Sequence, residues 1–163
     1  MVEPWLRGTL GEVDSVKRQV LHGLVLAGED VERWCAPLTE EELEMRPFGL
    51  APVGFHLRHL ARSLDRLMTY AEGNRLSAEQ LAGLSTEMMA SRGLEEFRAG
   101  LAVAMERLRG LDPGGYEDRR SVGRENLPST VGGLLVHCAE HTQRHLGQAI
   151  TTAKLVTAMG RAS

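Results

Sequence analysis

Apolar residues recur at steps of three and four along four stretches of the chain, which is the spacing of one face of an α-helix. These stretches lie near residues 10–36, 52–72, 94–109 and 129–158. No alternating run of β-branched residues is long enough to predict a sheet. The pattern therefore predicts an all-α protein with four long amphipathic helices.

Helix-breaking and helix-capping residues stand at the ends of these stretches. Pro37 ends the first helix, and Pro52 suits the first turn of the second. Gly73 suits the C-terminal end of the second helix, and Gly110 stops the third. Ser129 is expected to cap the fourth helix.

The connections carry weaker signals. Thr39 and Glu42 have the spacing of a capping box, which predicts a short helix over residues 40–44. Ser77 is expected to cap another short helical turn. Residues 112–128 are rich in glycine, proline and charge, and they predict a loop that leaves room for a little extended structure.

Four amphipathic helices with short connectors predict a four-helix bundle, formed by a single domain over residues 1–163. The connection between the second and third helices is longer, at roughly 20 residues. A connection of this length allows neighbouring helices to run parallel. The sequence therefore does not imply a simple up-down-up-down order.

Composition and charge exclude several classes of function. A chain of 163 residues suits one hydrophobic core, and with aromatic residues at 4% that core must consist of Leu, Val, Ala and Met. The formal net charge is −3 and no basic block is present, which argues against nucleic acid as a partner. No stretch approaches the roughly 20 apolar residues of a membrane span.

The N-terminus and the cysteines indicate the compartment. Residues 1–9 lack the basic-then-apolar plan of a signal peptide. Cys35 and Cys138 are too few for a disulfide framework, and both thiols are expected to be reduced and packed. We expect a soluble cytoplasmic protein.

Histidines are concentrated in two of the predicted helices. The fourth helix carries His137, His141 and His145 at steps of four, and such neighbours lie one turn apart on one side of a helix. His141 and His145 fall within the apolar stripe, where a buried imidazole needs a partner. A shared metal ion is one candidate partner, and a buried hydrogen bond is the other.

The second helix supplies two more histidines, His56 and His59. One ligand from this helix and two from the fourth would form a three-histidine site with positions open for water or substrate. Periodicity does not choose between the two, although His56 lies closer to the apolar stripe. His22 lies opposite the stripe of the first helix and is expected to be exposed.

Three segments resemble the DinB-like superfamily. The segment PVGFHLRHLARS (residues 52–63) resembles its second-helix signature, and TVGGLLVHCAEHTQRHLGQ (residues 130–148) resembles its last-helix signature. The segment EEEL (residues 40–43), followed by Arg46 and Pro47, resembles the short acidic segment that usually precedes the second helix. The likeness spans nearly the whole chain, although its middle is generic.

The resemblance implies that His59, His141 and His145 are the metal ligands. It also implies an up-down-down-up bundle, a homodimer, and zinc or nickel as the bound ion. Relatives in this family include thiol S-transferases that use bacillithiol or mycothiol, and a mycothiol-dependent isomerase.

These expectations lead to two classes of function. The first is a metal-dependent enzyme in which a divalent ion lowers the pKa of a bound thiol or water and so provides a nucleophile near neutral pH. It would act on a small-molecule substrate as a thiol S-transferase with a low-molecular-weight thiol as cosubstrate, or as a metal-dependent hydrolase. The alternative is a non-enzymatic metal- or ligand-binding module, or a structural dimer with a vestigial site.

Residues around the histidines have both functional and structural interpretations. Cys138 is either a soft metal ligand or a small core residue. Glu140 either orients a ligand histidine or belongs to a solvated face. Gly147 suits close helix packing or substrate approach, and Gln148 suits a hydrogen bond to a bound group or simple exposure.

Two arginines of the second helix, Arg58 and Arg62, lie near the predicted site. Either they bind a carboxylate of a thiol cofactor or they are ordinary surface charge. The sequence leaves these alternatives open.

Overall fold

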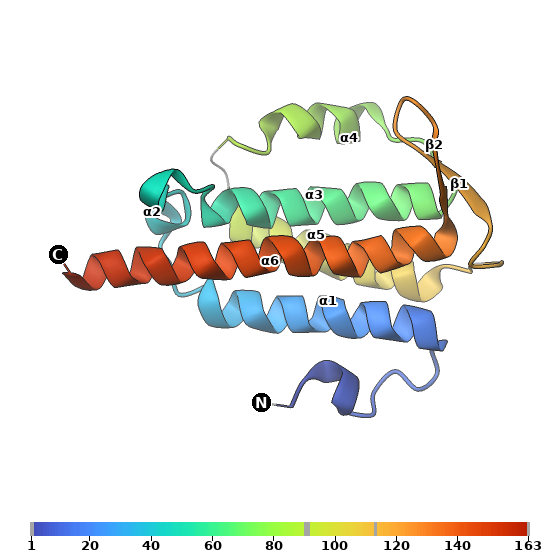
Figure 1. Ribbon diagram of the computed structural model, residues 1–163, viewed down its shortest axis with the longest axis horizontal. Coiled ribbons are helices and arrows are strands. Elements are labelled where there is room, and N and C mark those ends of the chain that lie inside the picture. The colour runs from blue at the N-terminus through green and yellow to red at the C-terminus, as the bar shows by residue number, and fades with distance from the viewer. Residues whose placement is uncertain (1, 90–91, 113, 163) are drawn as a thin grey trace.

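The computed structural model describes residues 2–89, 92–112 and 114–162 of the chain. Its four long helices are α1 (Ser15–Trp34), α3 (Val53–Ala71), α5 (Gly93–Gly110) and α6 (Val131–Ala162). Helices α1 and α6 run in one direction and α3 and α5 in the other, so the order is up-down-down-up (Figure 1). The prediction of an all-α four-helix bundle is confirmed.

Short helices connect the long ones. They are η1 (Pro4–Leu6), α2 (Glu40–Leu43), η2 (Pro47–Gly49), α4 (Ala78–Gly83) and η3 (Leu84–Thr86). The predicted capping box of Thr39 and Glu42 begins α2, and Ser77 caps α4 in a second box with Gln80. These caps satisfy backbone N–H groups that have no partner within the helix itself.

Strand structure is present where the sequence predicted a loop. Strands β1 (Arg119–Val122) and β2 (Leu127–Thr130) form an antiparallel hairpin. Strands of four residues are too short to show a clear alternation, and they correspond to the little extended structure for which the predicted loop left room. The turn places Gly123 and Asn126 at positive φ, a conformation that glycine and asparagine tolerate.

Two helix starts also differ from the predictions. Helix α1 begins at Ser15 rather than near residue 10, because the Asp14 carboxylate accepts hydrogen bonds from the N–H groups of Val16 and Lys17. Ser129 belongs to β2, and Thr130 takes over the capping of α6 by accepting a hydrogen bond from the Gly133 N–H at 3.0 Å.

Helices α3 and α5 pack closely side by side and run parallel. A Cβ atom built on Gly93 would lie 3.0 Å from the Gly54 carbonyl oxygen, and one built on Gly100 would lie 2.8 Å from the Ala61 Cβ. The long connection makes this direction possible, because the chain returns through α4 along the outer side of α3 before α5 begins (Figure 1). Helices α1 and α3 occupy opposite corners of the bundle.

The core between the helices consists of aliphatic side chains with one aromatic, Phe97. Both cysteines are buried and unpaired, and burial raises the pKa of each thiol to about 12. No helix in the described part of the chain is long and apolar enough to cross a membrane.

His22 is buried, with 5% of its surface exposed, so the expectation of an exposed residue was wrong. Residues before α1 fold back over this face of the helix. The Thr9 hydroxyl lies 3.3 Å from His22 Nε2, and Arg7 forms an ion pair with Glu29. Helical periodicity within α1 cannot predict that His22 is buried, because the residues that cover His22 lie outside the helix.

Two glycines inside helices provide a matched test of the α3–α5 contact. Gly100→Ala should destabilise the fold by about 1–3 kcal/mol, because the new Cβ forces α3 and α5 apart. Gly147→Ala on α6 should stabilise it by up to about 1 kcal/mol, because no atom lies within 4 Å of the new Cβ. Urea unfolding measures both values, and a stabilising Gly100→Ala would contradict the close packing.

Candidate metal centre

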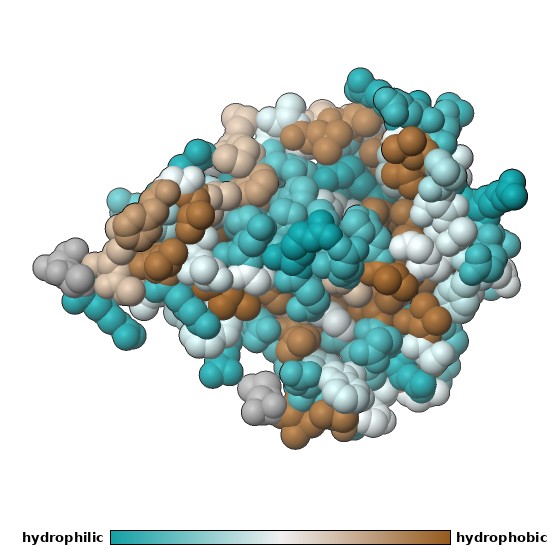
Figure 2. All heavy atoms as spheres, in the orientation of Figure 1, coloured by the Kyte–Doolittle hydropathy of each residue, from teal (hydrophilic) through white to brown (hydrophobic). Residues whose placement is uncertain are grey.

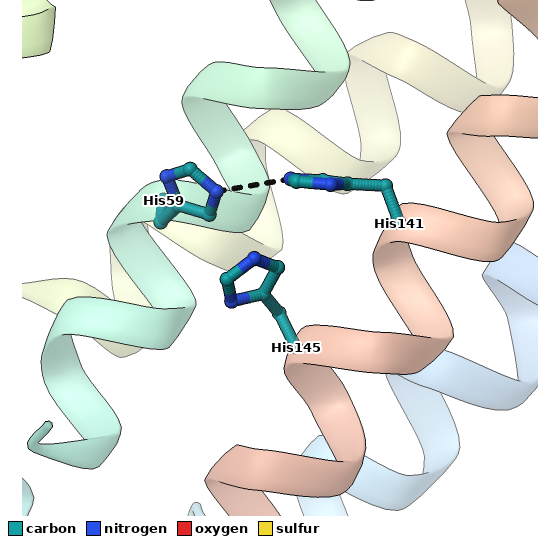
Figure 3. Close-up of side chains that lie close together, drawn as sticks. All are labelled: His59, His141 and His145. Atoms are coloured by element: carbon teal, nitrogen blue, oxygen red, sulfur yellow. Dashed lines mark hydrogen bonds between the residues drawn. The ribbon is translucent and has the colours of Figure 1, made fainter. Parts of the chain in front are cut away.

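Three histidines from two antiparallel helices face one another in the bundle. His59 comes from α3, and His141 and His145 come from successive turns of α6 (Figure 3). One nitrogen from each ring lies within 4.8 Å of the nitrogens from the other two. The closest pair is His59 Nε2 and His141 Nε2, at 2.9 Å.

The position of these rings follows from the pattern of α6. Cys138, Thr142 and Leu146 are buried in the core, whereas His141 and His145 are half-buried beside them. The two histidines therefore lie at the edge of the apolar stripe, on the side that faces α3. This placement gives the rings a protein environment on one side and access on the other.

A buried carboxylate holds the His59 ring. Glu87 Oε2 lies 2.7 Å from His59 Nδ1, and Arg66 donates a hydrogen bond to Glu87 Oε1 at 2.8 Å. A carboxylate accepts at this position, so His59 Nδ1 carries the proton and the Nε2 lone pair points to the other histidines. Carboxylate–histidine pairs of this kind orient metal ligands in many proteins.

Glu87 was not among the residues singled out from the sequence. It lies in the irregular connection between α3 and α5, where no periodicity places a side chain. A single acidic residue in such a segment forms no sequence pattern from which a functional role could be predicted. Its role depends on how the connection folds back against α3.

Arg58 stabilises the same segment and is fully buried, which rules out the interpretation as surface charge. Its Nε donates to the Glu87 backbone carbonyl at 3.0 Å, and its guanidinium pairs with Glu44. Arg62 is half-buried, pairs with Glu96 and donates to Thr86. Both arginines thus bind protein groups.

His56 lies behind His145 rather than in the cluster. The two Nδ1 atoms are 3.1 Å apart, so one ring must donate to the other. If His145 Nδ1–H is the donor, the His145 Nε2 lone pair is free to bind an ion. Only 5% of the His56 surface is exposed. Its position near the apolar stripe therefore predicted the more buried histidine of α3, but not the histidine that belongs to the cluster.

Burial and the neighbouring rings lower the pKa of His56, His141 and His145 and so disfavour their charged forms. Burial, and then the neighbouring His145 and His59, lower the pKa of His141 to about 4. Burial and His145 lower the pKa of His56 to about 4 as well, and the pKa of His145 is lowered mainly by burial. Neutral imidazoles offer lone pairs, which is the form that binds metal ions.

The donor set fits a divalent ion. Nitrogens that share one zinc ion at about 2.0–2.1 Å lie about 3–3.5 Å apart, and the closest pair here, at 2.9 Å, is slightly nearer than that, so a small separation of the rings would admit the ion. Three neutral imidazoles suit zinc, nickel, copper and iron. The Nδ1 atoms of His59 and His145 have partners outside the cluster. Each of these two rings has its other nitrogen, Nε2, toward the cluster.

The other residues singled out from the sequence lie outside the cluster. Cys138 is a buried core residue. His137 pairs with Glu140 at 3.1 Å, and Glu140 is exposed and also pairs with Arg144. Gly147 is exposed, so close helix packing does not explain it.

The fold and the site together define a class: a four-helix bundle with three converging histidines on two of its long helices. The family model described as the DinB superfamily matches residues 24–149. The chain therefore belongs to the DinB superfamily, as the resemblance indicated. Comparisons with curated proteins and with solved structures gave no match.

We predict that His59→Ala, His141→Ala and His145→Ala each abolish stoichiometric binding of zinc or nickel, because each removes one of three nitrogens. His137→Ala is the matched control on α6, since it lies outside the cluster and should bind one equivalent of ion. Isothermal titration with protein purified without an affinity tag measures the stoichiometry. If His59→Ala still binds one equivalent of metal and His56→Ala binds none, then His56 and not His59 would be the third ligand.

Glu87→Gln should weaken zinc binding about 10- to 100-fold, the usual cost of losing an outer partner of a ligand histidine. The amide keeps the shape of the side chain but cannot act as an anionic acceptor for His59 Nδ1–H. Glu96→Gln is the control, because it removes a carboxylate of α5 that pairs with Arg62 of α3 and not with a candidate ligand. Competition with a chromogenic chelator measures the affinity, and unchanged affinity would remove Glu87 from the site.

Proposed function

We propose that this chain binds a divalent metal ion, zinc or nickel, through His59, His141 and His145, and that it is a metal-dependent enzyme acting on a small molecule. The observation that carries the proposal is the convergence of three imidazole nitrogens within 4.8 Å of one another. A bound ion would supply Lewis acidity that lowers the pKa of a thiol or a water molecule.

The protein side chains have defined tasks in this proposal. Glu87 accepts the His59 Nδ1 proton and fixes the direction of its Nε2. In the tautomer in which His145 Nδ1–H is the donor, His56 would do the same for His145 by accepting this hydrogen bond. Three protein ligands leave a position for an exogenous group, which is the arrangement of catalytic rather than structural zinc sites.

A cavity bordered by His56, the partner of His145, offers room for a substrate; the three candidate ligands are not among its lining residues. Its volume is about 440 Å³, within the range of small-molecule sites. It is lined by Leu50, Ala51, His56, Arg144, Gly147, Gln148, Thr151 and Thr152. Gly147 has open space where a side chain would stand, so the absence of a side chain there keeps the cavity wide.

The reaction we favour is transfer of a low-molecular-weight thiol to a small electrophile, and hydrolysis is the second candidate. For thiol transfer, the chain must bring a thiol to the ion and an electrophile into the cavity. The Thr151 hydroxyl, which donates to the Gly147 carbonyl and can still accept a hydrogen bond, and the Gln148 amide provide hydrogen-bonding groups on the cavity wall for the second substrate.

The test uses protein loaded with zinc or nickel, a panel of cysteine, glutathione, bacillithiol and mycothiol, and the electrophile monochlorobimane. We expect conjugation with at least one thiol to exceed the uncatalysed rate and to be lost in His141→Ala. Gly147→Leu should bind metal normally but lose most of the conjugation, because its side chain fills the cavity.

Gly160→Leu is the matched control, because it adds the same side chain to α6 at a place with no atom closer than 4.0 Å. It should leave the rate unchanged. Hydrolysis of p-nitrophenyl esters without thiol would favour the hydrolase. Stoichiometric metal binding with no reaction of either kind would favour a non-enzymatic binding module.

A further inference from the structure

A second cavity lies at the end of the bundle, where the C-terminal end of α3, helix α4 and the β1–β2 hairpin meet. Its volume is about 840 Å³. Tyr70 on its wall stands eleven residues after His59 on α3, which corresponds to about 16 Å along the helix axis. The cavity is therefore separate from the metal centre, and we call it the hairpin cavity.

The hairpin cavity is strongly cationic although the chain carries a net charge of −3. Arg75, Arg119, Arg120 and Arg124 line it, and no aspartate or glutamate does among the residues the structure describes. Glu125 follows Arg124 in the hairpin turn but is not part of the lining. Four guanidinium groups around one cavity repel one another unless an anion accompanies them.

What distinguishes these arginines is that four of them line one cavity. Along the sides of the bundle, Arg58, Arg62, Arg66, Arg98 and Arg107 pair with carboxylates, whereas Arg18, Arg33 and Arg109 form no ion pair within the described residues but stand apart from one another in the sequence. Within the described residues, the arginines of the hairpin cavity form no ion pair with a carboxylate.

Arg120 is held in place by protein groups. Its Nε donates to the Ala71 carbonyl at 2.9 Å, at the end of α3, and its Nη1 donates to the Arg119 carbonyl at 2.9 Å. A guanidinium has five N–H donors, so others stay free to bind a ligand. This anchoring lowers the entropy cost of binding an anion, because the side chain is already ordered.

The opposite wall of the cavity is apolar. Leu81 and Leu84 are 39% and 50% exposed, and Leu76 and Tyr70 lie beside them. Figure 2 shows hydrophobic side chains gathered over α4 next to the hydrophilic tip of the hairpin. Exposed apolar side chains in a concave site are typical of ligand-binding surfaces.

We propose that the hairpin cavity binds a small amphiphilic anion: a carboxylate or phosphate monoester attached to an apolar chain or ring. The arginines provide paired N–H donors that match either oxyanion, and the leucines cover the apolar part. A concave site of this volume suits a small molecule. Tyr70 is the one aromatic residue in the described lining, too few for stacking of successive nucleotide bases.

Isothermal titration with eight-carbon probes below their micelle-forming concentrations tests the proposal. Octanoate or octyl phosphate should bind with one-to-one stoichiometry, and the tighter of the two identifies the oxyanion. Octanol and octyltrimethylammonium should bind at least tenfold more weakly, because they lack the anion. Inorganic phosphate should also bind at least tenfold more weakly, because it lacks the apolar chain.

Two pairs of variants assign the binding to this cavity. Arg119→Gln with Arg124→Gln should weaken octyl phosphate binding at least tenfold, whereas Arg109→Gln with Arg161→Gln removes the same charge elsewhere and should leave it unchanged. Leu84→Ser should weaken it at least threefold, and Val136→Ser, an equally exposed apolar residue on α6, should not. All these residues are exposed, so the fold should tolerate each change.

Three outcomes would overturn the proposal. The first is no binding of either anionic probe at millimolar concentration. The second is equal weakening by the two arginine pairs, which would indicate non-specific attraction. The third is binding to vesicles of phosphatidylglycerol without binding to the monomeric probes, which would indicate a membrane surface instead. Zinc binding should be unchanged in every one of these variants, whether or not the proposed catalytic function holds.

Discussion

The carboxylate of Glu87 connects the candidate metal centre to the rest of the fold. It is 7% exposed, and a buried carboxylate is stable only when charged or hydrogen-bonding partners surround it. Here Arg66 and His59 share its two oxygens, while Arg58 binds its backbone carbonyl. The same set of bonds fixes the irregular connection on α3 and sets which nitrogen of His59 is free, so stability and ligand geometry depend on one residue.

The direction of the helices explains how Glu87 reaches this place. Because α3 and α5 run parallel, the chain must travel back along the bundle between them, and it does so on the outer side of α3 (Figure 1). A simple antiparallel hairpin of helices would have no such segment. The long connection thus allows α3 and α5 to run parallel, and it carries Glu87, the hydrogen-bond partner of the candidate ligand His59. The first half of this connection forms one wall of the hairpin cavity.

Most of the fold could be predicted from the sequence, because helical stripes and capping boxes are local. The histidine ladder on α6 is local too, since one helical turn sets its spacing. The choice of His59 over His56 required the family resemblance: the cluster lies at the edge of the α3–α6 contact, whereas periodicity favours the centre. Glu87, the cover over His22 and the hairpin depend on contacts between distant segments, which periodicity does not describe. Metal binding itself stays a prediction.

The two candidate sites use opposite electrostatic strategies within one small bundle. At the candidate metal centre, burial and the neighbouring rings lower the pKa of His141 and His145, which favours the neutral form that presents lone pairs to a cation. At the hairpin cavity, exposure to solvent allows four guanidinium groups to stay charged side by side without carboxylate partners. Arginines that stabilise contacts between helices form ion pairs with carboxylates of the protein. The arginines of the hairpin cavity have no such partner within the described residues, and in our proposal an anionic ligand neutralises them.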